Sequence, residues 1–236
     1  MKRIILSLVV AAMTATASAQ PEPGTFSVIP RVGVALANIG NEYFYIDGDD
    51  GILTCKGKYR EGLAAGVDIQ YQASNLMAYS LGVGYARQGC KYKDSDLSTA
   101  KAGNYDAYSN VRTNLDYLNV PVMAHLYLAS GLSVNAGVQA GFLLHSTMSY
   151  DIADITINKD GSYTYNDKVQ HRSEELGLLR KMDFAIPVGF SFEYANVVVD
   201  FRYNISLTKV YKSEYADKET GGNKVFALTV GYKLDL

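Results

Sequence analysis

The chain has no tryptophan, two cysteines and five prolines among its 236 residues. Beyond its N-terminal region it also lacks a run of about eighteen apolar residues, which excludes a membrane-spanning helix from the mature protein. The net charge is −2, so no basic excess favours nucleic acid as a partner. Only 19% of the residues are charged and 48% are hydrophobic, which is too apolar for a disordered chain. The abundant residues are 19 tyrosines and 21 glycines, and this mixture favours strands and turns.

A secretory signal peptide is predicted over residues 1–19, followed by a single domain over residues 20–236. Lys2 and Arg3 supply its positive start, an apolar stretch follows, and Ala17, Ser18 and Ala19 form a small-residue cleavage pattern. Export to an oxidising compartment favours pairing of the two cysteines over metal binding or thiol catalysis.

Apolar residues alternate with small or polar residues along most of the mature chain. In the first such segment, Val32 and Val34 share one parity, whereas Arg31 and Gly33 share the other. Successive side chains of a strand point to opposite faces, so the alternation predicts strands with one apolar face. Eight strands of roughly 11 to 15 residues are predicted. Their alternating apolar residues fall within 26–36, 63–71, 77–85, 118–128, 132–142, 184–194, 197–207 and 226–236, and the strands extend somewhat beyond the shorter of these ranges.

Short and long connections alternate between the predicted strands. The short ones lie near Ser74-Asn75, Ala129 to Gly131 and Ala195-Asn196, and the long polar ones cover residues 40–59, 91–112, 148–180 and 212–223. Tight turns at one end and long loops at the other are typical of an outer-membrane barrel. The predicted fold is all-β, an eight-stranded antiparallel up-and-down transmembrane β-barrel with short periplasmic turns and long extracellular loops.

The main alternative is a secreted barrel of the lipocalin kind, which buries its large apolar residues and exposes its polar set. In this sequence nearly all the large apolar side chains share one face, and the other face carries glycine, alanine, serine and charged residues. The interior of an eight-stranded barrel is narrow, so small residues fit inside and large ones face lipid. The sequence therefore favours an apolar exterior.

Aromatic residues are expected to gather where the apolar belt meets the lipid headgroups. The predicted girdle on the short-turn side contains Phe26, Tyr71, Tyr79, Tyr194 and Tyr232, and the one towards the long loops contains Tyr85, Phe142 and Phe184. Tyrosine can take the place of the missing tryptophan, because its ring is amphipathic. Ordinary tyrosine preference for strands is the alternative explanation.

The signal peptide, the eight alternating strands and the segment Tyr117-Leu118-Asn119-Val120-Pro121-Val122 resemble the PorT-like outer-membrane β-barrel family of Bacteroidota. The resemblance spans the whole mature chain and includes a second proline-bearing segment at Ile186-Pro187-Val188. It implies insertion by the barrel-assembly machinery and residence among outer-membrane lipids. Such barrels often end in an aromatic residue, whereas this chain ends in Leu236.

The charged residues on the inward parity carry both signs, and buried charges need partners. A paired network is therefore expected inside the barrel. It comprises Arg31, Asp68, His125, Glu193, Asp200, Arg202, Lys233 and Asp235. The alternative is a narrow conducting channel, but the side chains of an eight-stranded barrel usually fill its interior.

No catalytic or metal site is predicted, and no cofactor is expected. The three histidines are assigned to hydrogen bonding, with His125 and His145 inward and His171 in the longest loop. An enzyme acting on lipid or lipopolysaccharide stays as an alternative, since it would need histidine, serine and acid residues converging at one depth. The carboxylates of Asp47-Gly48-Asp49-Asp50-Gly51 suit calcium, yet Lys58 stands where a bidentate glutamate belongs.

A disulfide between Cys55 and Cys90 is predicted. With a two-residue turn at Ser74-Asn75, the residue numbers of two cross-strand partners add up to about 149. Tyr59 is then opposite Cys90, and Cys55 is nearby in the chain. The glycines of loop 40–59 would let that loop fold back to close the offset.

The function expected from the sequence is non-enzymatic. Long loops on a rigid scaffold commonly carry binding, so the extracellular loops would meet the environment or a partner while the filled interior prevents leakage. Loop 148–180 is the longest candidate and contains Tyr150, Tyr163 and Tyr165 among polar residues. An extracellular or secretion partner is possible, and the sequence does not identify it.

Overall fold

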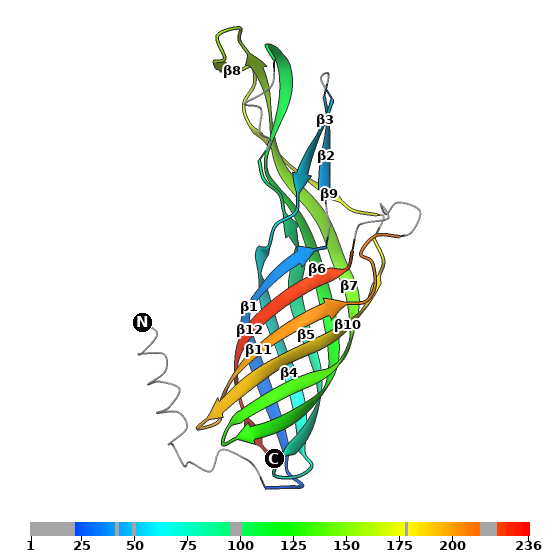
Figure 1. Ribbon diagram of the computed structural model, residues 1–236, viewed down its shortest axis with the longest axis vertical. Coiled ribbons are helices and arrows are strands. Elements are labelled where there is room, and N and C mark those ends of the chain that lie inside the picture. Colours follow the sequence, from blue (N-terminus) through cyan, green and yellow to red (C-terminus); the bar gives the residue numbers. More distant parts are fainter. Residues whose placement is uncertain (1–21, 41–42, 49–50, 95–100, 178, 213–220) are drawn as a thin grey trace.

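A closed ring of eight antiparallel strands forms the body of the molecule (Figure 1). The computed structural model describes residues 22–40, 43–48, 51–94, 101–177, 179–212 and 221–236. The ring runs β10-β11-β12-β1-β4-β5-β6-β7 and closes through pairing of β7 with β10. Its strands are β1 (Phe26–Ile39), β4 (Arg60–Gln72), β5 (Met77–Lys91), β6 (Gly103–Ala129), β7 (Leu132–Ile157), β10 (Met182–Tyr194), β11 (Val197–Ser206) and β12 (Asn223–Tyr232). The predicted fold class is confirmed.

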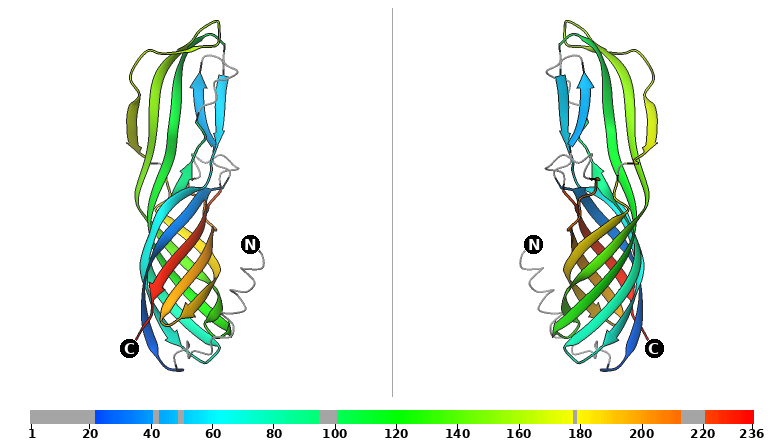
Figure 2. Two further views of the ribbon diagram at one scale, coloured as in Figure 1. Left: turned by 90° about the vertical axis from the view of Figure 1, so that its left-hand side faces the viewer. Right: turned by 90° about the vertical axis from the view of Figure 1, so that its right-hand side faces the viewer.

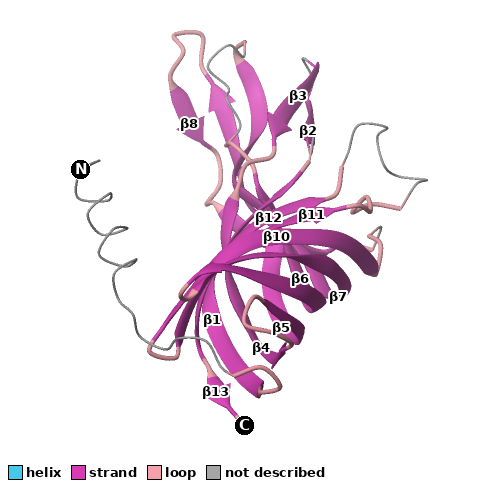
Figure 3. Cartoon of the chain, turned by 60° about the horizontal axis from the view of Figure 1, so that its bottom comes forward, coloured by secondary structure: helices cyan, strands magenta, loops and turns pink. Residues whose placement is uncertain are grey.

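The large apolar side chains lie on the outer face, as the alternation predicts. On β1, Val32 and Val34 are more than half exposed, whereas Ala35 and Ala37 are fully buried. Tyr71 and Phe26 are exposed beside each other with ring centroids 4.8 Å apart. A water-soluble barrel of the lipocalin kind would show the opposite arrangement. The strands tilt around the ring, which Figure 3 shows from the short-turn end.

The short connections lie at one end of the barrel, where the chain also ends (Figure 1). Ala195 and Asn196 both have positive φ, 47° and 67°, and join β10 to β11 as a two-residue turn. The turn near Ser74 is longer than predicted, because β4 ends at Gln72 and β5 begins at Met77. Paired positions there sum to 150, as in Gln72 with Ala78, instead of the predicted 149.

Two of the four predicted long loops contain long strands, which corrects the predicted strand lengths. β6 has 27 residues and β7 has 26, and their pairing continues to Gly103 and Ile157, far above the ring. β8 (Tyr163–Tyr165) and β9 (Gln170–Glu175) both add to β7. We call this projection the blade, comprising residues 103–109 and 150–175; it rises from one side of the barrel mouth (Figure 2).

The blade has its own small apolar cluster. Ala153, Ile155 and Ile157 on β7 are buried, and Tyr105 and Ala107 of β6 pack against them. The opposite face is polar: the Thr156 hydroxyl donates to the Asn104 amide oxygen at 2.8 Å. The blade has its own apolar cluster, and its strands are joined by backbone pairing, so it is a structured element. The sequence predicted irregular loops in this region.

Loop 40–59 contains a separate hairpin of β2 (Tyr43–Gly48) and β3 (Gly51–Lys56). The side chains of this hairpin, including Asp47 and Cys55, lie outside the described features, as do residues 49–50 and the predicted signal peptide. β13 (Leu234–Asp235) completes the chain by pairing with the start of β1. Among the described residues there is no helix with the length and apolar character needed to cross a membrane.

The predicted disulfide stays a prediction. Cys90 lies buried at the outer end of β5, and no disulfide occurs within the described part of the chain. A bridge pairs Lys58 with Lys91, which places residue 59 opposite Cys90 beyond an irregularity at Gly89, where φ is 108°.

Candidate functional site: the barrel interior

Four charged side chains meet near the middle of the barrel. Arg202 donates from Nη2 to Asp68 Oδ2 at 3.0 Å, and its Nε lies 2.7 Å from Asp200 Oδ1. Arg31 lies 3.1 Å from Asp68 Oδ1 and 3.7 Å from Asp200 Oδ1. We call this set the charge cluster. It joins three non-adjacent parts of the chain and contains two positive and two negative groups, which satisfies the need of buried charges for partners.

The strand beside Asp68, β5, carries small inward residues next to the charge cluster, and this leaves room for the long side chains. A Cβ atom on Gly82 would lie 2.0 Å from Asp68 Oδ1 and 3.2 Å from a ring carbon of Pro121. Glycine at position 82 therefore makes space for the Asp68 carboxylate. Alternation of small inward residues on β5 with long ones on β4 and β11 is what positions the cluster.

A second ion pair lies closer to the short-turn end. Lys233 Nζ donates to Glu193 Oε2 at 2.8 Å, with both side chains almost fully buried. Beside them, the Gln70 amide donates to the Tyr127 hydroxyl at 2.9 Å. Asp235, predicted inward, is exposed at the rim, where it accepts a hydrogen bond from Ser27 at 2.7 Å. These groups fill the lower end of the barrel.

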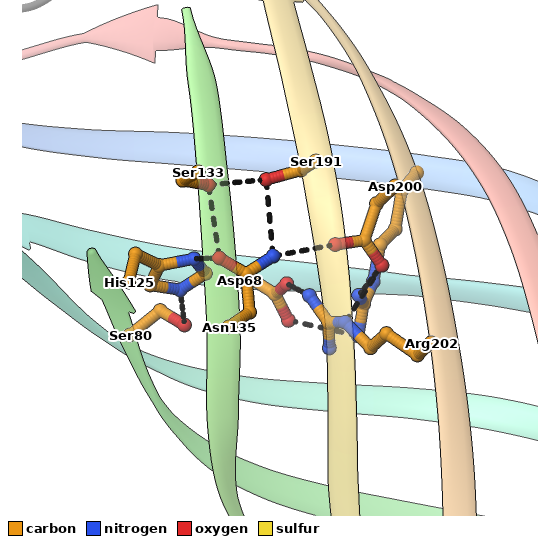
Figure 4. Close-up of polar contacts among 9 residues, drawn as sticks. Asp68, Ser80, His125, Ser133, Asn135, Ser191, Asp200 and Arg202 are labelled. Atoms are coloured by element: carbon orange, nitrogen blue, oxygen red, sulfur yellow. Dashed lines mark hydrogen bonds and ion pairs between the residues drawn. The ribbon is translucent and has the colours of Figure 1, made fainter. Parts of the chain in front are cut away.

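His125 occupies a line of hydrogen bonds beside the charge cluster (Figure 4). Its Nδ1 lies 2.9 Å from the Asn135 amide oxygen, and its Nε2 lies 2.8 Å from the Ser80 hydroxyl. An amide oxygen only accepts, so Nδ1 donates and the neutral ring accepts the Ser80 proton at Nε2. Asn135 donates in turn to Ser191 at 3.0 Å and Asp200 at 3.4 Å.

The order Ser80, His125, Asn135 has the form of a nucleophile, a base and an orienting group. Their exposed fractions are 5%, 5% and 3%. The cavity that touches His125 measures about 20 Å³, which is room for one or two water molecules. A substrate could not reach the serine oxygen without opening the barrel, so the arrangement serves as a hydrogen-bond network.

A larger cavity of about 50 Å³ lies above the charge cluster. It is lined by Asn119, Asn204 and Thr229, whose side-chain oxygens are buried without a hydrogen-bond partner. Buried polar atoms in a space of this size are usually satisfied by ordered water, and the volume fits about three to five molecules.

Apolar residues close the outer end of the barrel. Leu115 and Tyr117 of β6 are buried there, and Leu179 and Val210 reach over the mouth from the connections after β9 and β11. We call this cluster the apolar cap. It consists of Ile39, Cys90, Tyr92, Val111, Leu115, Tyr117, Leu179 and Val210. The interior is thus filled by charge and amide groups below and by packed apolar side chains above.

Several interior and rim residues of the structure are not predicted from the sequence. Asp183, at the start of β10, accepts hydrogen bonds from the Ser206 and Thr208 hydroxyls. Asn135 pairs directly with His125, and the turn centred on Ser130 was the signal that could have revealed it. His145 was predicted inward but is exposed, because an irregularity between Asp116 and Tyr117 shifts the register of β6 against β7.

No group of three or more potential metal ligands occurs in the part of the chain that the structure describes. The loop from Asp47 to Gly51 falls largely outside that part, so the sequence argument against calcium there, which is the lysine at position 58, stays a prediction.

The family of the chain is shown by comparison with known protein families. The model of the outer membrane protein β-barrel domain matches residues 18–212, which is most of the chain. The chain belongs to this family. Its members, together with the observed ring and its apolar exterior, place the protein in the bacterial outer membrane. No curated protein sequence matches significantly.

Solved structures that are similar to this chain include outer-membrane proteins of low sequence identity. The attachment invasion locus protein Ail of Yersinia pestis is 13% identical, with a TM-score of 0.42 over 90% of this chain and 99% of Ail. Neisserial surface protein A is 15% identical, with a TM-score of 0.38 over 89% and 97%. OprG from Pseudomonas aeruginosa is 11% identical, with a TM-score of 0.38 over 91% and 98%.

Proposed function

We propose that this outer-membrane barrel is a non-enzymatic protein that presents the blade for contact with molecules outside the cell. The observation that carries the proposal is the continuation of β6 and β7 above the ring, with β8 and β9 added and a buried cluster at Ile155 and Ile157. A rigid element fixed to a barrel holds its surface in one orientation, which reduces the entropy lost on binding.

The chemistry of the blade suits recognition. Tyr163 and Tyr165 on β8 are 51% and 68% exposed, and Val169 beyond them is 59% exposed. Exposed tyrosines bring a large amphipathic surface with little conformational freedom to lose, and they are enriched at binding surfaces. Polar groups such as Asn104 and Thr156 lie close by on β6 and β7.

The filled interior supports a role other than transport. The charge cluster and the apolar cap occupy successive levels of the barrel, and the cavity between them holds only a few waters. A narrow channel, the second candidate, would require both levels to open. Ser80, His125 and Asn135 follow one another like the nucleophile, base and orienting group of an enzyme. All three side chains are buried, however, and this argues against access by a substrate.

Three finer assignments accompany this proposal. The chain is proposed to be a PorT-like member of its family, to be inserted by the barrel-assembly machinery, and to lie among outer-membrane lipids. The identity of the extracellular or secretion partner is the object of the experiment below.

The experiment removes the blade and keeps the ring. Ser149 pairs directly with Ser173, and the backbone amide of Tyr92 donates to the carbonyl of Val111. Residues 150–172 and 93–110 can therefore each be replaced by an Asn-Gly turn. A photo-crosslinking residue is placed at Tyr165 in the full-length protein, and at the outward Val138 in both proteins.

In intact cells, crosslinking at Tyr165 is expected to give discrete adducts with a protein or glycan. Crosslinking at Val138 should give lipid adducts alone in both the full-length and the shortened protein. The proposal fails if positions 163, 165 and 169 all give no adduct, or if Val138 of the shortened protein captures the same molecule as Tyr165.

A further inference from the structure

A polar band crosses the outer face of β5, β6 and β7 directly above the apolar belt. Tyr85, Leu118 and Phe142 pair in register and form the last apolar row that the three strands share, with Leu144 of β7 exposed just beyond it. The next outward row begins with Arg87, which pairs with Asp116.

Asp116 pairs in turn with His145, and further out Lys91 pairs with Arg112. Because partners in a ladder share a face, these side chains all point away from the barrel axis. We call this set, with Glu61 of β4, the rim patch.

The carboxylates of the rim patch are already engaged. Asp116 Oδ1 accepts hydrogen bonds from the Tyr85 hydroxyl at 2.6 Å and from Arg87 Nε at 2.8 Å. Glu61 accepts one from Lys91 at 3.2 Å. The bond from Nε fixes the Arg87 guanidinium and leaves Nη1 free to donate.

The patch keeps a positive excess. Arg112 is exposed, and within the described residues no carboxylate lies within ion-pair distance of it. The side chains of Arg87 and Lys91 are 46% and 40% exposed. Within the rim patch three permanent cations thus face two carboxylates, and beyond the patch Arg112 also interacts electrostatically with Asp151.

The depth of the patch decides which anion can reach it. A strand rises about 3.3 Å per residue, so Arg87 lies about 7 Å along β5 beyond Tyr85. Aromatic girdles mark the level of the lipid headgroups. An anion bound at Arg87 would therefore stand directly above acyl chains, in the position of a headgroup. A soluble polyanion would meet the blade before it met this row.

We propose that the rim patch binds phosphate groups on the sugar head of an outer-leaflet glycolipid. Arg87 and Arg112 donate to the phosphate oxygens, because the guanidinium fork matches phosphate geometry and binds it more strongly than a neutral donor would. Asp116 is a positioning residue that orients Arg87. Basic side chains at the edge of a membrane-spanning region are a recurring way of holding anionic lipid headgroups. The site is independent of the blade and of its proposed partner.

The test measures the thermal midpoint of the folded, detergent-purified protein by the loss of its heat-modifiable gel band. Diphosphoryl lipid A is titrated into zwitterionic micelles with the wild type, Arg87→Gln/Arg112→Gln and Lys224→Gln. Lys224 is a matched control, since it is an exposed cation on β12, three strands away from β5 around the ring. The wild type and Lys224→Gln should be stabilised alike, and the double variant should need at least tenfold more lipid.

Three outcomes with the wild type overturn the proposal, namely stabilisation by dephosphorylated lipid A, by inorganic phosphate or by phosphatidylglycerol that equals the stabilisation by diphosphoryl lipid A. A fourth is a double variant that responds to diphosphoryl lipid A as the wild type does. The inorganic phosphate arm separates a lipid headgroup from free phosphate. If the double variant does not fold, the single variant Arg112→Gln tests the site, because Arg112 has no ion pair to lose among the described residues. It should then weaken the lipid A response by several-fold, and an unchanged response counts against the site.

Discussion

Asp68 accepts contacts from two guanidinium groups, Arg31 and Arg202, inside the barrel. Asp68→Asn would leave two buried cations facing Asp200 alone, and breaking a buried pair in this way costs about 3–5 kcal/mol. We expect the free energy of unfolding, measured by urea titration in phospholipid vesicles, to fall by that amount.

Asp235→Asn is the control for this measurement, because its carboxylate is exposed at the rim and bonded only to Ser27. It should cost less than about 1 kcal/mol, as expected for a surface interaction. Equal losses for Asp68→Asn and Asp235→Asn would show that the charge cluster does not stabilise the barrel.

Ser80 provides a test of the enzyme alternative. A fluorophosphonate reacts with a serine only where the hydroxyl is activated and accessible, and Ser80 is 5% exposed beneath packed side chains. We predict no labelling of the folded protein, measured by intact mass, and unchanged folding of Ser80→Ala. Labelling that disappears in Ser80→Ala would contradict the assignment of this line as a structural network.

The alternation of residues along each strand predicts which side chains face inward. It does not predict which of these side chains contact one another. Arg31 and Arg202 follow from alternation, but their contacts with Asp68 and Asp200 depend on the stagger between four strands. The error at His145 has the same origin, since one irregularity in β6 and β7 reverses the parity of every residue beyond it.

At the level of elements, β9 is held to β7 within the blade partly through Asp151. Hydrogen bonds from Asn110 and from His171 lower the pKa of Asp151 below its usual range. A carboxyl whose pKa is lowered by folding stabilises above its unfolded value, about 3.9, and that contribution is lost as the pH falls through the folded value. We expect the pairing of β9 with β7 to loosen below about pH 4.

Amide hydrogen exchange of residues 170–175 measures this loosening, after correction for the intrinsic pH dependence of exchange. The wild type should lose protection between pH 6 and pH 3, whereas Asp151→Asn should show a smaller change with pH. Protection that is equally pH-dependent in both proteins would place the titrating group elsewhere.

The ring strands could be predicted because each has one face in lipid and one in the narrow interior, which produces strong alternation. The upper part of β6 has solvent on much of both faces, so its sequence, with Asn104, Asp106 and Tyr108, lacks that contrast. In the upper part of β7 apolar and polar residues do alternate, as Ile155 and Ile157 show. Because several polar residues precede this part, the sequence predicts it as part of loop 148–180. Strand extension beyond a membrane is therefore hard to separate from a polar loop by hydrophobicity alone.

At the scale of the whole molecule, the charge cluster and the apolar cap close the interior at two levels and by different interactions. The charge cluster fills the cross-section with ion-paired side chains, and the apolar cap excludes water from the outer mouth. We predict no conductance steps for the wild type in planar bilayers. Leu115→Ala/Leu179→Ala should remain silent because the cluster still fills the barrel, and Arg31→Ala/Asp68→Ala should remain silent because the apolar constriction stays dry.

Combining the four substitutions with Lys233→Ala/Glu193→Ala, which also empties the lower end of the barrel, should allow small ions to pass. The alanine substitutions in the cap cost about 2–5 kcal/mol each, so the gel mobility of every variant is checked before recording. Conductance by the wild type, or by either pair of substitutions alone, would refute two independent closures. Silence of a folded variant that carries all six substitutions would refute them as well, because other residues lining the cavity, such as Asn119 and Asn204, would then have to block the path.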